Sequence, residues 1–440
     1  MNCSHYIKVY PYEETPGQLL VYSTKKASIA LIPETIFASI QNNTLSPEEA
    51  EALGKLGIIE PDREDEKREM RHVLDRLNAK NKGLTISVII NMACNFECVY
   101  CYEGSLKGGH YMSEKTAGLL IDFIKERFTG DKDLLHLDFY GGEPLLSISL
   151  IREISETLTS FTAQRGAKYT FSLVSNGSLF SRKAAEELVP VGLDAVRITL
   201  DGDAETHNRY RPYRTGKGSF DTIIENIRET CGLVKMGIGG NYDRGTYERF
   251  PLLLDYLEKE GLTPDRIYEI KFGPVSKRPE EDSSPADYTD WCLSVNEPWV
   301  LKAGMMLREE ILKRGYNTPK IMPMPCQVEI NDSYVVNYDG GIYKCPALVG
   351  RKGFEAGNLA DGNPAHAQAG CGDPYKADFW KNATCLACEY LPLCFGGCRY
   401  MAFVRNGNID SPDCRRPFFD AALETFIKQD IKYRKPARPS

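Results

Sequence analysis

The sequence has no long hydrophobic run. No apolar stretch in its 440 residues reaches the roughly 18 to 20 residues that a membrane-spanning helix needs. The N-terminus also lacks the basic segment and apolar core of a secretory signal. Positive charge is not in excess, because the chain has 54 Lys and Arg and 61 Asp and Glu. This balance excludes an overall positive charge that would attract nucleic acid. We therefore expect a soluble, cytoplasmic protein that binds neither membranes nor nucleic acid.

Cysteine, by contrast, is abundant, with 14 residues. In a reducing compartment, clustered cysteines indicate metal binding or catalysis more often than disulfides. Cys94, Cys98 and Cys101 follow a C-x3-C-x2-C spacing. A zinc site uses four ligands, and no further Cys or His follows this triplet at a suitable distance. An iron–sulfur cluster held by three thiolates would instead leave one iron open, as catalytic metal sites do.

A regular alternation of apolar and amphipathic segments begins at Leu84. Helix-like segments fill the gaps between six strand-like runs, at residues 84–90, 134–140, 168–174, 194–200, 233–239 and 267–273. This alternation predicts an α/β fold with a parallel sheet and right-handed crossovers, either doubly wound or an incomplete (β/α) barrel. In both architectures, ligands bind at the carboxyl ends of the strands.

Polar or glycine-containing motifs follow four successive predicted strands. The cysteine triplet follows the first, YGGEP (140–144) the second, SNG (175–177) the third and DGDAETHNRYR (201–211) the fourth. Packing alone does not explain motifs at four successive strand ends. This edge of the sheet is therefore the predicted active site.

The C-x3-C-x2-C spacing after the first strand of a βα repeat resembles that of the radical S-adenosylmethionine (SAM) superfamily. The resemblance implies a partial (β/α)6 TIM-like barrel and a [4Fe–4S] cluster on the three cysteines, whose open iron binds the amino and carboxylate groups of SAM. One electron, supplied by a donor such as flavodoxin or ferredoxin, cleaves SAM to a 5′-deoxyadenosyl radical. The protein positions that radical against one C–H bond of the substrate.

Further residues match the SAM-contacting positions of that superfamily. Gly141, Gly142 and Glu143 match its GGE motif, in which glycine lets the backbone approach the ligand and the carboxylate accepts from the SAM ammonium. The remaining matches are Tyr100 near the adenine, Thr199 as a hydroxyl contact, Arg211 as the partner of the SAM carboxylate, and Ser175 and Asn176 on the ribose side.

A second group of cysteines occupies the C-terminal region, and it comprises Cys326, Cys345, Cys385, Cys388, Cys394, Cys398 and Cys414. The four in CLACEYLPLCFGGC would suffice for tetrahedral zinc, but seven are too many for one ion. The spacing resembles the SPASM domain of radical SAM maturases, which carries two auxiliary [4Fe–4S] clusters. The resemblance implies one cluster on Cys385, Cys388, Cys394 and Cys414, and the other on Cys326, Cys345 and Cys398.

The cluster assigned to Cys326, Cys345 and Cys398 is one ligand short, because no cysteine lies between Cys326 and Cys345. The fourth ligand could be Cys371, Cys292 or Asp332, or the iron could stay open. An open iron would bind a substrate thiolate. We therefore expect a thioether (Cys-to-carbon) crosslink as the product. Carbon–carbon crosslinking and epimerisation, with Cys292 as a hydrogen-atom donor, are the alternatives.

Residues 1–82 are predicted to form a separate module. Strand-like runs at 6–10, 18–23 and 27–33 precede helices at 33–41 and 46–57 and a charged helix at 64–80, which we expect to be a solvated linker. This order resembles the PqqD-like recognition element, a winged-helix module that binds a leader peptide by pairing it with an edge strand. The remaining predicted domains are the partial barrel (83–280), a helical bridge (281–325) and the SPASM domain (326–440).

Together these features predict an enzyme, a radical SAM/SPASM maturase that abstracts hydrogen from a ribosomally made precursor peptide. A protein maturase of the anaerobic sulfatase or quinohemoprotein type is another alternative. Sulfatase maturases place an aspartate base directly after the cysteine matching Cys345, where this chain has Pro346, so formylglycine formation by that route is not expected. A non-catalytic iron–sulfur or zinc scaffold would not need GGEP, Thr199 and Arg211 at strand ends.

Overall fold

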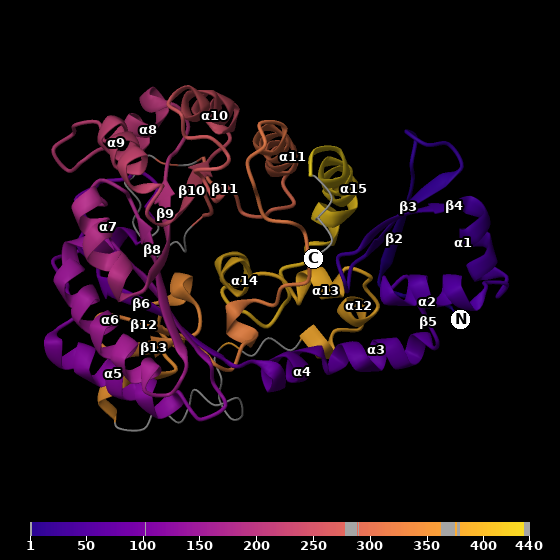
Figure 1. The fold of residues 1–440 in the computed structure, drawn as a ribbon, viewed down its shortest axis with the longest axis horizontal. Coiled ribbons are helices and arrows are strands. Elements are labelled where there is room, and N and C mark those ends of the chain that lie inside the picture. The colour runs from indigo at the N-terminus through magenta and orange to yellow at the C-terminus, as the bar shows by residue number, and fades with distance from the viewer. Residues whose placement is uncertain are drawn as a thin grey trace. The chain divides into compact units, whose positions relative to one another are not determined.

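The computed structural model describes residues 2–101, 103–277, 288, 290–361, 375 and 379–434, and Figure 1 shows its ribbon. The chain divides into two compact units that are both discontinuous in sequence. Unit 1 comprises Met1–Lys80, Lys320–Ile330 and Lys376–Ser440, and unit 2 comprises Asn81–Pro319 and Asn331–Tyr375. The described part of the chain has no helix that is long and apolar enough to cross a membrane.

A sheet of nine described strands forms the frame of unit 2, in the order β11-β10-β9-β8-β7-β6-β12-β13-β14. The six predicted strands are confirmed as β6 (Gly83–Asn91), β7 (Leu134–Gly141), β8 (Lys168–Ser175), β9 (Leu193–Thr199), β10 (Lys235–Tyr242) and β11 (Glu269–Pro274). These six are parallel and neighbour one another in chain order. Because this order has no reversal, it agrees with the predicted partial (β/α)6 barrel and not with a doubly wound sheet.

Three further strands extend the sheet beyond β6. Strand β12 (Ser333–Val336) pairs parallel to β6, whereas β13 (Gly341–Tyr343) and β14 (Gly357–Asn358) continue in antiparallel pairs. Part of the chain that follows Cys326 therefore belongs to the sheet of unit 2.

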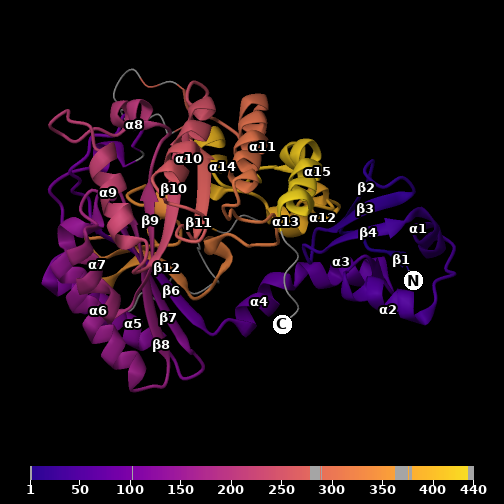
Figure 2. The same ribbon diagram turned by 45° about the horizontal axis from the view of Figure 1, so that its top comes forward.

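Helices cover one face of the parallel strands. They are α5 (Glu114–Arg127), α6 (Ile148–Ala163), α7 (Arg182–Leu188), α9 (Phe220–Thr230) and α10 (Phe250–Lys259). Alternate strand residues, such as Leu135, Leu137 and Phe139 of β7, are fully buried in the core on this face. Figures 1 and 2 show α5, α6 and α7 on the same side of strands β6–β8. We call the opposite face of the parallel strands the polar face, because Ser87, His136, Asp138, Ser172, Arg197 and Lys271 alternate there with the core residues.

Two more helices complete the described part of unit 2. Helix α8 (Ala204–Tyr210) follows β9, and α11 (Pro298–Lys313) occupies part of the predicted helical bridge. Ala303, Leu307 and Ile311 of α11 are buried in the same core as the strands. Residues 278–287 and 289, which include the start of that bridge, lie outside the described residues.

Unit 1 begins with a small antiparallel sheet. Its strands are β2 (Ile7–Pro11), β3 (Gln18–Ser23) and β4 (Ile29–Pro33), in the order β2-β3-β4, and α1 (Glu34–Gln41) and α2 (Pro47–Lys55) follow. These elements confirm the predicted ones. Helix α2 begins with a capping box, in which Ser46 and Glu49 each accept from the backbone N–H of the other. Strands β1 (Asn2–Cys3) and β5 (Ile59–Glu60) pair separately.

The predicted charged helix is divided into α3 (Arg63–Arg71) and α4 (Val73–Lys80), with the break at His72. The expectation of a solvated linker is wrong for one side of these helices. Met70 and Leu74 are buried in an apolar cluster, and the buried carboxylate of Glu66 pairs with Lys25. The charge run therefore contributes both apolar and ionic contacts to the interior of unit 1.

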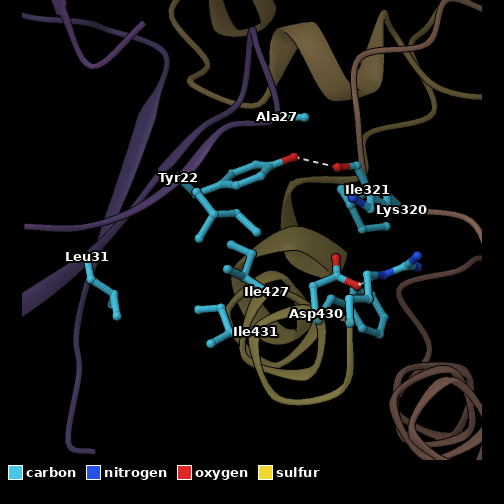
Figure 3. Close-up of a pocket in the computed structure, with 11 residues that line it drawn as sticks. Tyr22, Ala27, Leu31, Lys320, Ile321, Ile427, Asp430 and Ile431 are labelled. Atoms are coloured by element: carbon cyan, nitrogen blue, oxygen red, sulfur yellow. Dashed lines mark hydrogen bonds and ion pairs between the residues drawn. The ribbon is translucent and has the colours of Figure 1, made fainter. Parts of the chain in front are cut away.

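The C-terminal part of unit 1 packs against the β2–β4 sheet. It contains α12 (Ala383–Leu386), α13 (Leu391–Cys394), α14 (Arg399–Asn406) and α15 (Arg416–Tyr433). Tyr22 of β3 shares an apolar cluster with Tyr390, Phe419 and Leu423. Its hydroxyl donates to the backbone oxygen of Ile321 (2.6 Å) at the side of a pocket of about 420 Å³ between β3, β4 and α15 (Figure 3).

Short 3-10 helices lie in the connections. They occupy Gly104–Leu106, Pro144–Ser147, Val189–Val191, Tyr247–Arg249, Gln327–Glu329, Pro346–Leu348, Leu359–Asp361 and Phe379–Lys381.

Candidate active site

The GGE motif lies directly against the segment that leads into the cysteine triplet. The N–H of Gly142 donates to the oxygen of Asn91 (3.1 Å), and the N–H of Glu143 donates to the oxygen of Ala93 (2.8 Å). A Cβ on Gly141 would lie 2.2 Å from the Asn91 oxygen, and a Cβ on Gly142 would lie 2.2 Å from the Ala93 oxygen. Both positions therefore require glycine, because any side chain would separate the end of β7 from the cysteine segment.

The carboxylate of Glu143 is fully buried and is held by the end of β8. It accepts hydrogen bonds from the Ser175 hydroxyl (2.8 Å), the Asn176 N–H (2.8 Å) and the Leu145 N–H (3.1 Å). Burial raises the pKa of Glu143, although these hydrogen bonds oppose the rise. The side-chain amide of Asn176 lies 3.9 Å from the Cys94 sulfur. One network thus joins the GGE motif, the end of β8 and the first cysteine.

The three cysteines of the triplet lie close enough to act on one another electrostatically. Burial raises the pKa of the Cys94 thiol and raises that of Cys98 to about 11, and the neighbouring thiols add to both shifts. Lys107 lies near all three, and their charges raise its pKa against the effect of burial. Thiols held this close ionise together only when a cation compensates their charge.

The arrangement of these thiols fits a cluster better than a single ion. Within the described ranges, no group of three or more His, Cys, Asp or Glu side chains is placed to hold one metal ion. The thiolates of an iron–sulfur cluster bind different irons, so they lie farther apart than ligands that share one ion. Three neighbouring but separate thiols are therefore compatible with the predicted [4Fe–4S] cluster.

Tyr100, Asp201 and Arg211 form a buried group next to the triplet. The Tyr100 hydroxyl donates to the Asp201 carboxylate and accepts from Nη1 of Arg211 (2.7 Å). Asn241, in β10, donates to the Tyr100 hydroxyl through its side chain (3.1 Å) and to Asp201 through its backbone (2.7 Å). The Arg211 guanidinium lies 3.8 Å from the Asp201 carboxylate. The ends of β9 and β10 thus hold Tyr100 and Arg211 in place.

Arg211 keeps a donor that the protein does not use. Its Nε is buried and has no hydrogen-bond partner among the described residues. A buried donor without a partner costs about 1–3 kcal/mol, which an anionic ligand would recover. This donor fits the predicted role of Arg211 as the partner of the SAM carboxylate.

His207 supports Arg211 from the protein side. Its Nδ1 accepts from the Asp201 N–H (3.2 Å), and its Nε2 lies 3.0 Å from the Ser219 hydroxyl, which donates to the Arg211 oxygen (2.8 Å). Burial, and then the charge of Arg211, hold the pKa of His207 well below its ordinary value. The imidazole is therefore a neutral acceptor at Nδ1.

The sequence alone did not identify Asp201 and Asn241, although they connect the predicted residues. Asp201 offered a signal, because it follows β9 directly and begins the DGD motif. Asn241 offered none, because the predicted strand ended at residue 239 and β10 continues to Tyr242. Thr199 ends β9 as predicted, and it lies opposite Gly239 of β10.

The cysteines of the C-terminal segment also form a group. Burial raises the pKa of Cys385, Cys388 and Cys394, and the charges of Cys394 and Cys414 add to the rise. A turn with two glycines brings the Cys414 segment against Cys394, as described next. These thiols therefore come together within unit 1.

The glycine turn consists of Gly396 and Gly397, both of which have positive φ. The oxygen of Gly396 accepts from the Asp413 N–H (2.9 Å), and a Cβ on Gly397 would lie 2.0 Å from the Asp413 oxygen. The FGGC motif is thus required for the close approach of the chain that carries Cys414.

The ligands predicted for the other auxiliary cluster are divided between the units. Cys326 and Cys398 belong to unit 1 and Cys345 belongs to unit 2. Burial raises the pKa of Cys326, and the charge of Cys398 adds to it. The cluster assigned to these three residues stays a prediction from their spacing.

The three candidates for its fourth ligand have different surroundings. The Asp332 carboxylate pairs with Lys132 (2.8 Å). Cys292 is buried, with its sulfur 4.0 Å from the Ser276 hydroxyl. Cys371 lies outside the described residues.

Residues 88–239 match the family model of the radical SAM superfamily. The matched range begins in β6 and ends in β10. It therefore includes the cysteine triplet, the GGE motif, the end of β8, Thr199 and Arg211.

Three curated relatives illustrate the range of sequence similarity. An uncharacterized protein of Methanocaldococcus jannaschii is 32% identical over 278 residues, which are 61% of this chain and 86% of that protein. A cysteine-type anaerobic sulfatase-maturating enzyme of Clostridium novyi is 22% identical over 386 residues, which are 80% of this chain and 99% of that one. The Fe-coproporphyrin III synthase of Methanosarcina barkeri is 29% identical over 203 residues, which are 45% of this chain and only 47% of that relative.

Several solved structures share the fold over most of the chain. Native anSMEcpe with bound AdoMet and Cp18Cys peptide has a TM-score of 0.61 at 18% identity and covers 80% of this chain and 99% of its own. Streptococcus suis SuiB bound to precursor peptide SuiA has a TM-score of 0.53 at 14% identity and covers 94% of this chain and 98% of its own.

Proposed function

Since the chain belongs to the radical SAM superfamily of enzymes, we propose that it is a peptide maturase that removes a hydrogen atom from a ribosomally made precursor peptide and forms a thioether crosslink. The observation that carries the radical SAM part of this proposal is the unused Nε of Arg211. It lies in the buried group with Tyr100 and Asp201, next to three thiols that need a compensating cation.

The predicted site residues would each bind one part of the cofactors. Cys94, Cys98 and Cys101 would hold a [4Fe–4S] cluster, which together with SAM supplies a carbon radical after one-electron reduction. Arg211 would bind the carboxylate of SAM, and Thr199 would contact the bound SAM from the end of β9.

The surrounding side chains hold the residues of this site in one arrangement. Asp201 holds Tyr100 and Arg211 in one orientation, so little reorganisation is needed when SAM binds. The GGE motif keeps the cysteine segment against β7. The carboxylates of Glu143 and Asp201 and the neutral imidazole of His207 are all buried.

A peptide substrate is supported by unit 1. Strand β4 is an edge of the β2–β4 sheet among the described residues, and Leu31 on it is 40% exposed. An extended peptide can add to such an edge through main-chain hydrogen bonds. The pocket beside it is lined by Ile29, Leu31, Ile427 and Ile431, with Asp430 and Arg434 also in its wall (Figure 3). This pocket would take an apolar side chain of the precursor, in the manner of a PqqD-like element.

Two auxiliary [4Fe–4S] clusters complete the proposed cofactors. Cys385, Cys388, Cys394 and Cys414 would hold the one in unit 1, where their thiols come together. Crosslinking after hydrogen abstraction releases one electron, and an auxiliary cluster would accept it. Formylglycine formation is not proposed, because Pro346 follows Cys345 and cannot accept a proton.

Anaerobic reconstitution with iron and sulfide, followed by SAM and dithionite, tests the radical SAM chemistry. The wild-type protein should release 5′-deoxyadenosine and methionine. Arg211→Gln should lose most of this activity at unchanged iron content. Arg214→Gln, at an exposed arginine on the same segment, serves as the matched control and should keep it. Absence of 5′-deoxyadenosine from the wild-type reaction would refute the proposal.

The bond that forms is tested with a precursor peptide encoded next to the gene. A thioether predicts a product lighter by two hydrogen atoms in which one cysteine no longer reacts with alkylating reagents. A product lighter by two hydrogen atoms that keeps all its thiols reactive would favour carbon–carbon crosslinking. A mass that is unchanged in ordinary water but rises by the uptake of deuterium in D₂O would favour epimerisation.

A further inference from the structure

The polar face of the parallel sheet carries two cations that the proposed function does not use. Ile198 of β9 and Ile270 of β11 belong to the core under the helices, so their neighbours Arg197 and Lys271 lie on the opposite face. Both side chains are exposed. Neither makes a hydrogen bond or an ion pair with another residue in the described ranges.

The strand between them presents only glycine on this face. Gly239 of β10 lies opposite Thr199 on β9 and opposite Lys271 on β11. A Cβ on Gly239 would lie 3.4 Å from Cδ and 3.5 Å from Cγ of Arg197. The stem of Arg197 therefore crosses β10 above this glycine, toward the strand that carries Lys271. Gly237, which pairs with Arg197 and with Glu269, leaves the next position open as well.

The two cations act on each other electrostatically. Although the Lys271 side chain reaches solvent, desolvation by the surrounding protein, and then the charge of Arg197, lower its pKa, and these effects exceed the opposite effect of Glu269. Glu269 lies two residues before Lys271 on β11 and therefore on the same face. It makes no ion pair with Lys271 within the described residues. Two like charges side by side raise the free energy of the protein unless an anionic ligand compensates them.

The nearest other carboxylate on this face is already bound. Asp138 of β7 accepts from the Ser172 hydroxyl and lies 3.3 Å from Nε2 of His136. Burial alone would raise the pKa of Asp138, but the hydrogen bonds from His136 and Ser172 outweigh it and lower the pKa. The charge of Arg197 also lowers the pKa of Asp138, but the two side chains form no ion pair in the described ranges, so the guanidinium keeps its hydrogen-bond donors.

We propose that Arg197 and Lys271 form a carboxylate-binding site for an aspartate or glutamate side chain of the peptide substrate. A guanidinium binds both oxygens of a carboxylate as a planar fork, and the ammonium adds a second positive charge. Because Gly239 has no side chain, the stem of Arg197 can lie against β10 on the side of Lys271. Thr199 lies level with Lys271 across Gly239, so a peptide anchored here lies next to the predicted SAM contact. This inference rests on the proposed function, because it names a feature of the same substrate.

A small probe tests the site in the full-length protein. Reductive methylation with ¹³C-formaldehyde labels lysines and keeps their charge, and loss of one resonance in Lys271→Arg assigns the Lys271 signal. N-acetyl-glutamyl amide should shift this signal, whereas the uncharged N-acetyl-glutaminyl amide should not. Arg197→Gln should weaken the binding of the glutamyl amide about tenfold, as expected for one lost charge-assisted hydrogen bond.

Lys235→Gln is the matched control. Lys235 lies on β10, is exposed and pairs with Asp194 (3.0 Å), so its replacement should leave the titration unchanged. An equal response to the glutamyl amide in wild type and Arg197→Gln overturns the inference. It is also overturned if saturation with SAM abolishes the response, because the cations then serve SAM itself. Formation of 5′-deoxyadenosine by the wild-type protein decides the proposed function independently of this titration.

Discussion

A methyl group on Gly142 would collide with the backbone of Ala93, because its Cβ would lie 2.2 Å from the Ala93 oxygen. The next residue, Glu143, donates its N–H to the same oxygen (2.8 Å). The GGE motif therefore supports the segment that carries the cysteine triplet, in addition to its predicted contact with SAM. Neither partner in the collision is a flexible side chain, so the contact cannot relax without moving the segment.

Gly142→Ala should separate the end of β7 from the cysteine segment. We expect a loss of about 2–4 kcal/mol in stability, because a backbone collision and a buried hydrogen bond are both affected. Iron bound by the triplet should fall in parallel. Gly118→Ala is the control, since Gly118 in α5 has open space around it and alanine favours helix there. Thermal unfolding and iron content measure both effects, and wild-type values for Gly142→Ala would contradict the prediction.

Asp201→Asn should weaken SAM binding without loss of iron. Asparagine keeps the size of the side chain but removes the charge that orients Tyr100 and Arg211. We expect the Kd for SAM to rise about tenfold, which corresponds to one charge-assisted hydrogen bond. Asp194→Asn, near the start of β9 in an exposed ion pair with Lys235, should leave the Kd unchanged. Equilibrium dialysis of the reconstituted protein measures this, and equal Kd values for both variants would show that Asp201 is not a positioning residue.

His207 should make the folded protein less stable in mild acid. Its folded pKa lies below the ordinary value of 6.5, so the unfolded chain binds more protons below that pH. The stability contribution of neutral His207 is present above about pH 6.5 and is lost as the pH falls, by up to about 1.4 kcal/mol per pH unit. Urea unfolding at about pH 7.5, 6.5 and 5.5 measures how the free energy of unfolding depends on pH.

The slope should become smaller in His207→Gln, which has no group to titrate. His72→Gln removes an exposed histidine and should keep the wild-type slope. An identical slope in all three proteins would assign the pH dependence to other groups.

Cys414→Ala should remove one auxiliary cluster. Cys414 acts electrostatically on Cys385 and Cys394, and the glycine turn at Gly396 and Gly397 brings its segment against them. The iron content should fall by about four atoms per chain, the content of one [4Fe–4S] cluster. Cys231→Ala, at a buried cysteine outside both groups, should not change it. Unchanged iron in Cys414→Ala would exclude Cys414 as a ligand.

Glu66→Gln should destabilise unit 1. The carboxylate of Glu66 is buried, pairs with Lys25 and accepts a hydrogen bond from the Ser4 hydroxyl. We expect a loss of about 1–3 kcal/mol, because Lys25 keeps Glu60 as a partner and the ion pair is only partly broken. Glu64→Gln, in an exposed pair with Lys67, should change stability by less than about 0.5 kcal/mol. Chemical unfolding of the two variants distinguishes these values.

Local patterns in the sequence predicted the strands and the candidate ligand groups. The six parallel strands were predictable because their apolar runs are bounded by turn residues, and the cysteine spacings identified both groups of thiols because ligand spacing is a property of a short segment. The same local signals predicted the three short strands of the N-terminal module.

The tertiary structure decided which residues from distant segments meet. Tyr100, Asp201 and Asn241 come together because β6, β9 and β10 end at the same edge of the sheet. The register of the strands depends on how they pair, so it cannot be predicted from any one segment alone. Arg197 and Lys271 likewise lie on one face with only glycine between them because of the register of β9, β10 and β11. The N-terminal sheet and the C-terminal cysteine segment form one unit because burying Tyr22 against Tyr390 and Leu423 removes apolar surface from water, a non-local gain in free energy that local sequence patterns do not reveal.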